Sequence, residues 1–286
     1  MKEYLIAQHR IRLNGNAMWQ ETVASLDGFA TFETAIAGES LATFEECPHN
    51  APSMIECQYQ TCANGVNNRF GRYNEGHIFC MEHENGEQLT LWKPNGKQQV
   101  WFHGSRMPQL LKFGLWIAYG LVTLSHNTVA IHSSVIVSQE KAVIFLGESG
   151  TGKSTHTRLW REHIQGATLL NDDSPIVRII DGEARVFGSP WSGKTPCYKQ
   201  ANYPLAGCVR LSQAPYNEIR RLPIPQAYAA IHPSCPPDFA YDDTLYDHIG
   251  NFIGELLNQT PVFHLACLPN AEAAHLSYKH TLNSPL

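Results

Sequence analysis

Apolar residues and turn-forming residues alternate at short intervals over the first hundred positions. Short runs such as "HIFCME", "QLTLW", "QQVWFHG" and "TFETAIA" are separated by Asn-Gly dipeptides at Asn14-Gly15, Asn64-Gly65, Asn85-Gly86 and Asn95-Gly96. Asn-Gly favours the tight turns that join antiparallel strands. The pattern therefore predicts an antiparallel sheet built from hairpins.

From Pro108 to about Ser125 the apolar positions change to a helical spacing. Leu111, Leu115 and Val122 are among the residues that recur on one helical face, and Pro108 stands where a helix can begin. We expect this helix to link two domains. The prediction is a β-rich domain over residues 1–107 and a second domain over residues 108–286.

The second part of the chain alternates between strand and helix patterns. Two strands are predicted at Val135–Val137 and Ala142–Leu146, with "SQEK" as their turn. The second strand is apolar throughout, as expected of a strand that is buried on both faces. A helix should begin near Lys153 and be followed by a strand in "ATLLNDD".

The remaining pattern predicts a hairpin, two strands and two helices. The hairpin has "PIVRII" and "ARVF" as its arms and Asp181-Gly182 as its turn. Strands are expected in "LAGCVRL" and "PVFHLACL", and helices over Asp243–Leu257 and Asn270–Leu282. These elements indicate a mixed α/β fold.

Composition and charge narrow the functional classes. The 286 residues carry a formal net charge of -5 and no run of basic residues, so binding to nucleic acid or to an anionic membrane is not expected. The longest apolar run, Leu115–Leu124, is shorter than the roughly 17–25 residues that span a bilayer. The first residues show no secretion signal, and the 8 cysteines form no Cys-x-x-Cys pair. We expect a cytoplasmic protein with reduced thiols.

A phosphate-binding motif follows the apolar strand at Ala142–Leu146. The segment "GESGTGKS" fits the pattern G-x-x-x-x-G-K-[ST], in which glycines let main-chain N–H groups point into one concavity. The helix behind it adds free N–H groups, the lysine adds a charge, and the serine hydroxyl can bind Mg²⁺. We expect nucleotide contacts from Gly147, Ser149, Gly150, Thr151, Gly152, Lys153, Ser154 and Thr155.

Two adjacent carboxylates, Asp172 and Asp173, come a short helix and one strand later. Such a pair is costly after a buried strand unless it binds a cation, ionises unequally or faces solvent. Beside a nucleotide, one carboxylate can hold Mg²⁺ while the other accepts the proton of an attacking hydroxyl. The alternative is an Asp-Asp turn at the surface.

A second cation follows in "GSPWSGK", which ends at Lys194. Glycines and proline shape a tight loop there, and Trp191 can pack or stack. Lys194 can neutralise charge on the transferred phosphoryl group. The alternative is a surface lysine on a loop that the tryptophan holds.

The segment "IHSSVIVSQEKAVIFLGESGTGKST" together with "LLNDD" resembles the catalytic core of HPr kinase/phosphorylase and, more distantly, that of ATP-dependent phosphoenolpyruvate carboxykinase. The likeness runs from about Val129 to Val177. It implies that Lys153 neutralises phosphate charge, that Asp172 is the general base, and that Ser154 and Asp173 hold Mg²⁺. His132 matches a histidine near the acidic pair, and a structural role for it is the alternative.

The chain departs from HPr kinases after the acidic pair. Their glycine- and arginine-bearing segment is missing, and "VFGSPWSGKTPCY" stands in its place. This resembles a divergent HPr-kinase-like group of bacteria, some members of which modify peptides encoded nearby. The N-terminal domain does not resemble that of the HPr enzymes either. HPr as substrate and phosphorylase activity are therefore not expected.

The sequence predicts a P-loop core of the HPr-kinase and carboxykinase type, preceded by an antiparallel β-rich domain. The function expected is an ATP- and Mg²⁺-dependent kinase that phosphorylates a Ser or Thr hydroxyl of a protein or peptide. Two alternatives stay open: a small alcohol or free amino acid as acceptor, and a regulator that binds ATP without turnover. The resemblance also implies an assembly of identical subunits.

Overall fold

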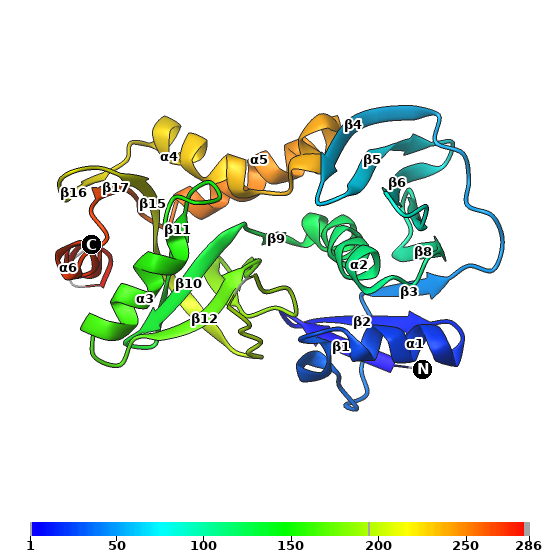
Figure 1. Ribbon diagram of the computed structural model, residues 1–286, viewed down its shortest axis with the longest axis horizontal. Helices are drawn as coiled ribbons and strands as arrows, with labels where there is room; N and C mark the ends of the chain where they lie inside the picture. The colour runs from blue at the N-terminus through cyan, green and yellow to red at the C-terminus, as the bar shows by residue number, and fades with distance from the viewer. Residues whose placement is uncertain (1, 194, 283–286) are drawn as a thin grey trace. The chain divides into compact units, whose positions relative to one another are not determined.

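The computed structural model describes residues 2–193 and 195–282 and has a mixed α/β fold with two large sheets (Figure 1). Contacts between residues divide the chain into two compact units. The first consists of Met1–His126 with Asp238–Tyr246, and the second of Asn127–Pro237 with Asp247–Leu286.

The first unit is built on an eight-stranded sheet in the order β1-β2-β3-β8-β7-β6-β5-β4. Its strands are β1 (Lys2–Ile6), β2 (His9–Asn14), β3 (Ala42–Glu46), β4 (Glu56–Ala63), β5 (Val66–Tyr73), β6 (Gly76–His83), β7 (Gln88–Pro94) and β8 (Gln99–Gly104). The strands from β4 to β8 pair antiparallel in sequence order. Three of the predicted Asn-Gly turns join them, and the φ angles of 52° at Asn64 and 73° at Gly65 are those of such a turn.

The prediction of a wholly antiparallel first sheet is wrong at β3, which runs parallel to both β2 and β8. A parallel pair needs a long crossover, and here the chain passes through α1 (Ala17–Ser25) and the 3-10 turn η1 (Phe29–Phe32) between β2 and β3. Asn14-Gly15 therefore opens a crossover and not a hairpin. Most of "TFETAIA" lies outside any strand because its start belongs to η1.

The predicted helix at Pro108 is confirmed as α2 (Pro108–Thr123), followed by the turn η2 (Leu124–His126). Its Gly114 lies so close to β6 and β7 that an added Cβ would come within 3.1 Å of Met81 Cε and 3.2 Å of Leu89 Cδ2. This packing groups α2 with the first unit, whereas the sequence analysis began the second domain at residue 108.

A buried carboxylate fixes the segment Asp238–Tyr246 within the first unit. Asp242 Oδ2 accepts hydrogen bonds from Arg72 Nε at 2.7 Å and Gln58 Nε2 at 3.3 Å, and it lies 3.3 Å from His77 Nε2. Its Oδ1 accepts from the Leu245 amide at the start of α5 (Asp243–Leu257). Burial favours a higher pKa for Asp242, but these neighbours outweigh it and lower the pKa.

The second unit contains a nine-stranded sheet in which β12-β10-β11-β15-β14-β13-β9 form one path, β17 lies beside β15, and β16 lies beside β17. Its strands are β9 (Thr128–Ala130), β10 (Ser133–Ser138), β11 (Lys141–Leu146), β12 (Thr168–Asp173), β13 (Ile176–Ile180), β14 (Glu183–Phe187), β15 (Asn202–Gln213), β16 (Glu218–Arg221) and β17 (Val262–Cys267). Besides α5, the helices that follow or separate them are α3 (Lys153–His163), α4 (Ile224–Ile231) and α6 (Ala271–Leu282), with short turns η3 (His232–Ser234) and η4 (Pro237–Tyr241). The hairpins with turns at "SQEK" and Asp181-Gly182 are confirmed.

Strand direction brings several strand ends to one edge of this sheet. The strands β11, β15 and β17 are parallel, and β10 is antiparallel to both β11 and β12. The carboxyl ends of β11, β12, β15 and β17 therefore meet at the same edge. In α/β sheets this is the edge at which ligands bind.

The helices α3 and α6 cover one face of the sheet. Phe145 on β11 packs edge-on against Trp160 of α3, with 5.5 Å between ring centroids, in a core that also includes Val209 and Leu265. His156 is buried in the same region, where its Nε2 lies 2.9 Å from Ser277 Oγ on α6. Because this core fixes α3 against β11, it also fixes the loop that connects them.

We predict that Asp242→Asn lowers the free energy of unfolding by about 3 kcal/mol, because it leaves the Arg72 guanidinium without its buried counter-charge. Urea denaturation of the parent and variant measures the difference. Asp243→Asn, at the exposed neighbouring position, is the control and should change stability by about 0.5 kcal/mol or less. Equal stability of the Asp242 variant and the parent would contradict the role given to this carboxylate.

We predict a pH-dependent contribution from His156, whose pKa burial lowers to about 4. The unfolded chain takes up this proton near pH 6.5, so between pH 6.5 and 4 the unfolded state binds more protons and is favoured. The contribution of His156 to stability should fall by about 3 kcal/mol over that interval. In urea titrations, the stability of the parent relative to His156→Gln should fall accordingly between pH 7.5 and 4.5. A stability difference between parent and His156→Gln that stays constant with pH would show that His156 is not buried as a neutral ring. His275→Gln, at an exposed position on α6, is the control.

Candidate functional site

The loop between β11 and α3, Gly147–Gly152, carries the motif that predicts phosphate binding and is called the cradle below. Gly150 and Gly152 have φ angles of 85° and 102°, which residues other than glycine rarely adopt, and α3 begins directly after Gly152. At Gly147 an added Cβ would lie 2.4 Å from Thr151 Oγ1. Thr151 itself closes the loop by donating its hydroxyl and its amide to Glu148 O, at 2.8 and 3.2 Å. The glycines of the motif are thus required by conformation and space.

The Lys153 ammonium lies across the start of this loop. Its Nζ donates to Gly147 O at 2.7 Å and to Glu148 O at 3.3 Å, and it lies 3.1 Å from His132 Nε2. Burial lowers the pKa of Lys153, and the carboxylates of Asp173 and Asp172 act in the opposite direction. A cation is therefore held where the motif needs one for phosphate oxygens.

Asp172 is the buried member of the acidic pair, with 5% of its surface exposed. Its carboxylate accepts hydrogen bonds from the hydroxyls of Ser134, its register partner on β10, and of Ser154, the first-turn serine of α3. Ser154 Oγ lies 3.2 and 3.3 Å from the two oxygens of Asp172. These bonds tie β12, β10 and the cradle together at one carboxylate.

Asp173 and His132 form the exposed side of the same cluster. Asp173 Oδ1 lies 3.7 Å from His132 Nδ1, and about half of each side chain is accessible, 45% and 49%. Burial and the Lys153 ammonium lower the pKa of His132. Because an ammonium only donates, the neutral ring accepts from Lys153 at Nε2 and carries its proton on Nδ1, toward Asp173.

The loop that follows β14 is fastened to the acidic pair through the backbone. The Gly193 amide donates to Asp172 O at 2.7 Å, and a Cβ at Gly193 would lie 3.1 Å from Asp173 Cβ. The Asn171 side chain binds both the loop and the acidic pair. Its Nδ2 donates to Trp191 O at 3.1 Å, and its Oδ1 accepts from the Asp173 amide at 2.8 Å. Trp191 is buried, as the packing interpretation of this loop expected. Lys194, predicted as a catalytic cation, lies outside the described residues.

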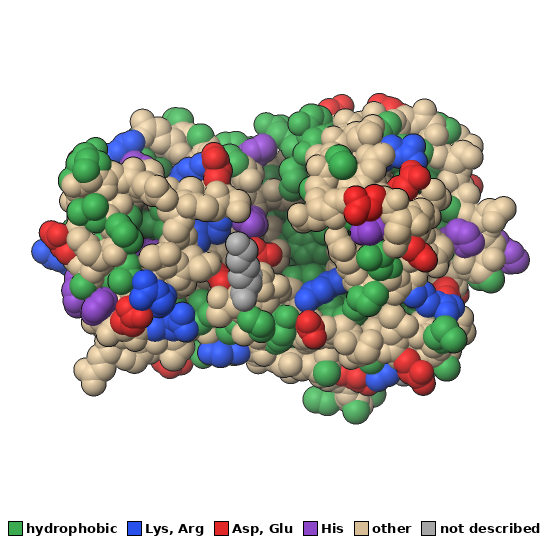
Figure 2. All heavy atoms as spheres, in the orientation of Figure 1, with side chains coloured by type: hydrophobic (Ala, Val, Ile, Leu, Met, Phe, Trp, Pro, Cys, Tyr) green, Lys and Arg blue, Asp and Glu red, His purple; other side chains and the backbone are tan. Residues whose placement is uncertain are grey.

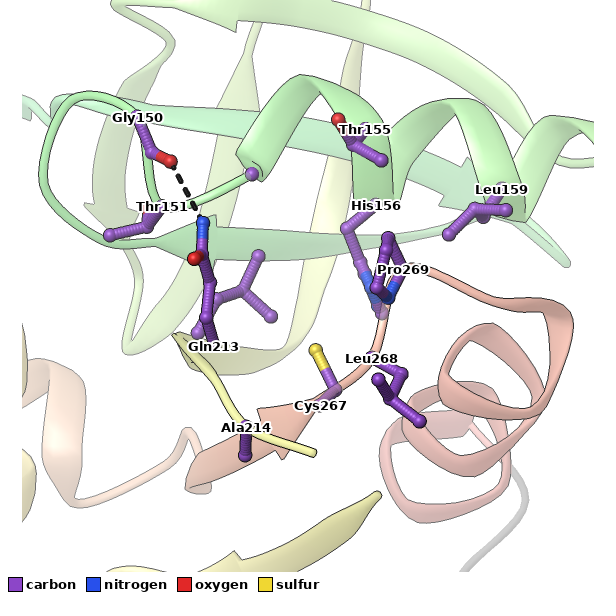
Figure 3. A pocket seen from close by; sticks show the side chains of 12 residues that line it. Gly150, Thr151, Thr155, His156, Leu159, Gln213, Ala214, Cys267, Leu268 and Pro269 are labelled. Carbon is purple, nitrogen blue, oxygen red and sulfur yellow. Dashed lines mark hydrogen bonds between the residues drawn. The ribbon is translucent and has the colours of Figure 1, made fainter. Parts of the chain in front are cut away.

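A cavity of about 600 Å³ opens beside the cradle on the side of β15 and β17 (Figure 3). Gly150, Thr151 and Gly152 of the loop and Thr155 of α3 line it, so half of the residues expected to contact a nucleotide face this space. Its other walls come from His156 and Leu159 of α3 and from the far ends of β15 and β17. These walls had no sequence signal, because they combine segments more than fifty residues apart.

The structure brings together most of the residues that the motifs singled out. Lys153, Ser154, Asp172, Asp173 and His132 converge at the edge where β11 and β12 end. The sequence analysis missed Ser134 and Asn171. A signal for both exists, since "IHSSVIV" and "LLNDD" place polar residues within otherwise apolar strands. Arg158 pairs with Glu162 on the exposed face of α3.

Ser154 Oγ and the Asp172 carboxylate are oxygen donors of the kind that Mg²⁺ takes. Within the described part of the chain, no three His, Cys, Asp or Glu side chains are grouped for a metal. Mg²⁺ is usually held by one or two carboxylates and by substrate phosphates, with bonds near 2.0–2.1 Å that place adjacent oxygens about 3 Å apart. The separations between Ser154 Oγ and the Asp172 oxygens are close to that spacing.

Figure 2 shows Lys, Arg, Asp, Glu and His side chains spread over the visible face of the molecule. Arg210, at the end of β15, adds a cation 3.7 Å from Glu148 of the cradle and also donates to Ala230 O.

None of the helices in the described residues has the length and apolar character needed to cross a membrane.

Comparisons with known proteins find a distant likeness among solved structures. No family model and no curated protein matches this chain. Among solved structures, it is similar to the Hpr(Ser) kinase/phosphatase from Coxiella burnetii, with 11% sequence identity and a TM-score of 0.33. The likeness covers 54% of this chain and 97% of that one. A score this low does not establish a shared fold, so the function is inferred from the geometry of the site itself.

Proposed function

We propose that this protein is a Mg²⁺-dependent kinase that transfers the γ-phosphoryl group of ATP to a hydroxyl, with Ser or Thr of a protein or peptide as the expected acceptor. One observation carries the proposal. A glycine cradle, the ammonium of Lys153, the hydroxyl of Ser154 and the carboxylates of Asp172 and Asp173 converge at a single edge of the sheet. Phosphoryl transfer depends on positioning and charge neutralisation by such a set.

The cradle and Lys153 bind the phosphate chain in this proposal. Main-chain N–H groups of the loop and of the first turn of α3 donate to phosphate oxygens. Lys153 Nζ, which now donates to Gly147 O and Glu148 O, exchanges these carbonyls for β- and γ-phosphate oxygens. Mg²⁺, when bound, neutralises charge that develops on the γ-phosphoryl group.

The two carboxylates divide the metal and the proton between them. The contact between Ser154 and Asp172 supports these two residues as the metal side of the site. Asp173 is half exposed and next to His132, so an incoming hydroxyl can reach it. Asp173 then accepts the proton as the acceptor oxygen bonds to the γ-phosphorus and the bond to the β-phosphate oxygen breaks. This division reverses the roles expected from the sequence, which made Asp172 the base and paired Ser154 with Asp173.

His132 and the Gly193 amide act as positioning groups. The proton on His132 Nδ1 faces Asp173, and the ring also contacts Lys153, so His132 fixes both relative to each other. The Gly193 amide holds the backbone of Asp172 and thereby the direction of its side chain. Neither group needs to change its protonation for the transfer.

We predict different losses for the two aspartates. Asp173→Asn should reduce phosphoryl transfer by ~10²-fold or more and leave the affinity for Mn²⁺-ATP nearly unchanged, because it removes only the proton acceptor. Asp172→Asn should weaken Mn²⁺ binding in the presence of ATP by ~10-fold or more. Transfer is measured with γ-labelled ATP and lysate of the source cell, and Mn²⁺ affinity by electron paramagnetic resonance.

Lys153→Ala is the control for this experiment and should lose the labelling. Labelling that persists with it comes from a contaminating kinase. If Asp172→Asn loses transfer with unchanged Mn²⁺ affinity, the roles are those expected from the sequence. If both aspartate variants transfer phosphate at the parent rate, the kinase proposal is wrong.

A further inference from the structure

The cradle lies between the acidic pair on one side and the cavity on the other. In the sheet, β11 carries the cradle at its end; β10 and β12, with Asp172, lie on one side, and β15 and β17 lie on the other. The cavity opens on the β15 and β17 side. Carboxylates, cradle and cavity therefore follow one another along a single edge of the sheet.

The walls of the cavity combine apolar surface with one amide. Leu159 of α3, Leu211 of β15 and Leu268 after β17 contribute apolar side chains. Figure 3 shows Gln213 extending from the end of β15 to the loop, where its Nε2 donates to Gly150 O at 3.2 Å. Cys267, at the end of β17, is half-buried in the same space, and burial raises the pKa of its thiol. The thiol is therefore neutral at physiological pH.

We propose that this cavity binds the base of the nucleotide and selects adenine over guanine. This inference rests on the proposed function and adds the orientation of the nucleotide: the base in the cavity, the phosphates across Gly147–Ser154 and the γ-phosphate toward Asp172 and Asp173. The volume of about 600 Å³ lies within the range of small-molecule sites, ~300–1,000 Å³.

The selectivity follows from hydrogen-bonding capacity. Guanine presents two adjacent donor groups, N1–H and the 2-amino group, and burying them without acceptors is costly. Among the 12 described residues that line the cavity, no side chain is a carboxylate. The Gln213 amide nitrogen donates one hydrogen to Gly150 O, and its Oε1 can accept a hydrogen bond from the amino group of adenine.

Asn217 holds the outer wall of the cavity in place. Its Oδ1 accepts from the Leu268 amide at 2.9 Å, and its Nδ2 donates to Glu272 Oε2 at 2.8 Å and to Asn270 Oδ1 at 3.1 Å. The amide of Ala214 also donates to Cys267 O. The loops after β15 and β17 are thus fastened to each other, which makes Asn217 a positioning residue for the base.

The test compares ATP, GTP and inorganic tripolyphosphate, each with Mg²⁺, by isothermal titration calorimetry. The parent should bind ATP at least ~10-fold more tightly than GTP. Cys267→Phe fills the cavity and should lose at least ~10-fold in ATP affinity, while tripolyphosphate, which needs only the cradle, binds as before. Asn217→Ala should weaken ATP binding and leave tripolyphosphate unchanged. Cys62→Phe, on exposed β4, is the matched control.

Each result decides a separate claim. Parental ATP affinity in Cys267→Phe would overturn the base site, and equal binding of ATP and GTP by the parent would overturn the selectivity. If the parent binds neither ATP nor tripolyphosphate, the proposed function itself fails. Should Cys267→Phe not fold, alkylation of Cys267 in the parent serves instead. ATP should slow it and tripolyphosphate should not, and equal rates with both would contradict the base site.

Discussion

The buried carboxylate of Asp172 is the contact on which the arrangement of the candidate site depends. It accepts hydroxyl hydrogen bonds from Ser134 on β10 and Ser154 on α3, and its own backbone accepts from Gly193. A carboxylate at this depth is tolerated only when such partners satisfy it. The same bonds hold the acidic strand, its neighbour and the cradle in one position relative to one another. The acidic pair and the cradle are thereby fixed to the strands of the sheet.

The order of strands determines which side of the cradle carries the carboxylates and which side carries the cavity. On one side of β11, β10 is antiparallel to it and β12 runs in the same direction as β11, so the carboxylates at the end of β12 lie at the carboxyl end of β11. On the opposite side, the ends of the parallel strands β15 and β17 line the cavity. A nucleotide fits this order in one direction, with its reactive phosphate near the carboxylates. Lys153 and His132 lie on the carboxylate side and supply the cation and the positioned ring that this end needs.

The sequence predicts those parts of the structure that depend on neighbouring residues. The Asn-Gly turns between β4 and β8, the apolar strand β11 and the start of α3 at Lys153 follow from local backbone preference and periodicity. The parallel pairing of β3 did not follow, because pairing partners are chosen by packing over long separations. The side chain of Asn16 caps the start of α1 and could have indicated a helix there. Asn14-Gly15 was interpreted as a hairpin turn instead. At the site, the sequence motifs identified the motif residues. They did not identify Ser134, Asn171 or the cavity walls, because strand register determines where these lie.

The central claim is that one triphosphate occupies the cradle with its metal between Ser154 and Asp172. A crystal structure of the protein with Mn²⁺ and a non-hydrolysable ATP analogue tests it most directly. The account predicts an anomalous peak for Mn²⁺ within about 2.2 Å of Ser154 Oγ and next to the Asp172 carboxylate, with the base in the cavity lined by Leu211 and Cys267. A triphosphate bound elsewhere, or an Asp172 side chain turned away from the metal, would contradict it.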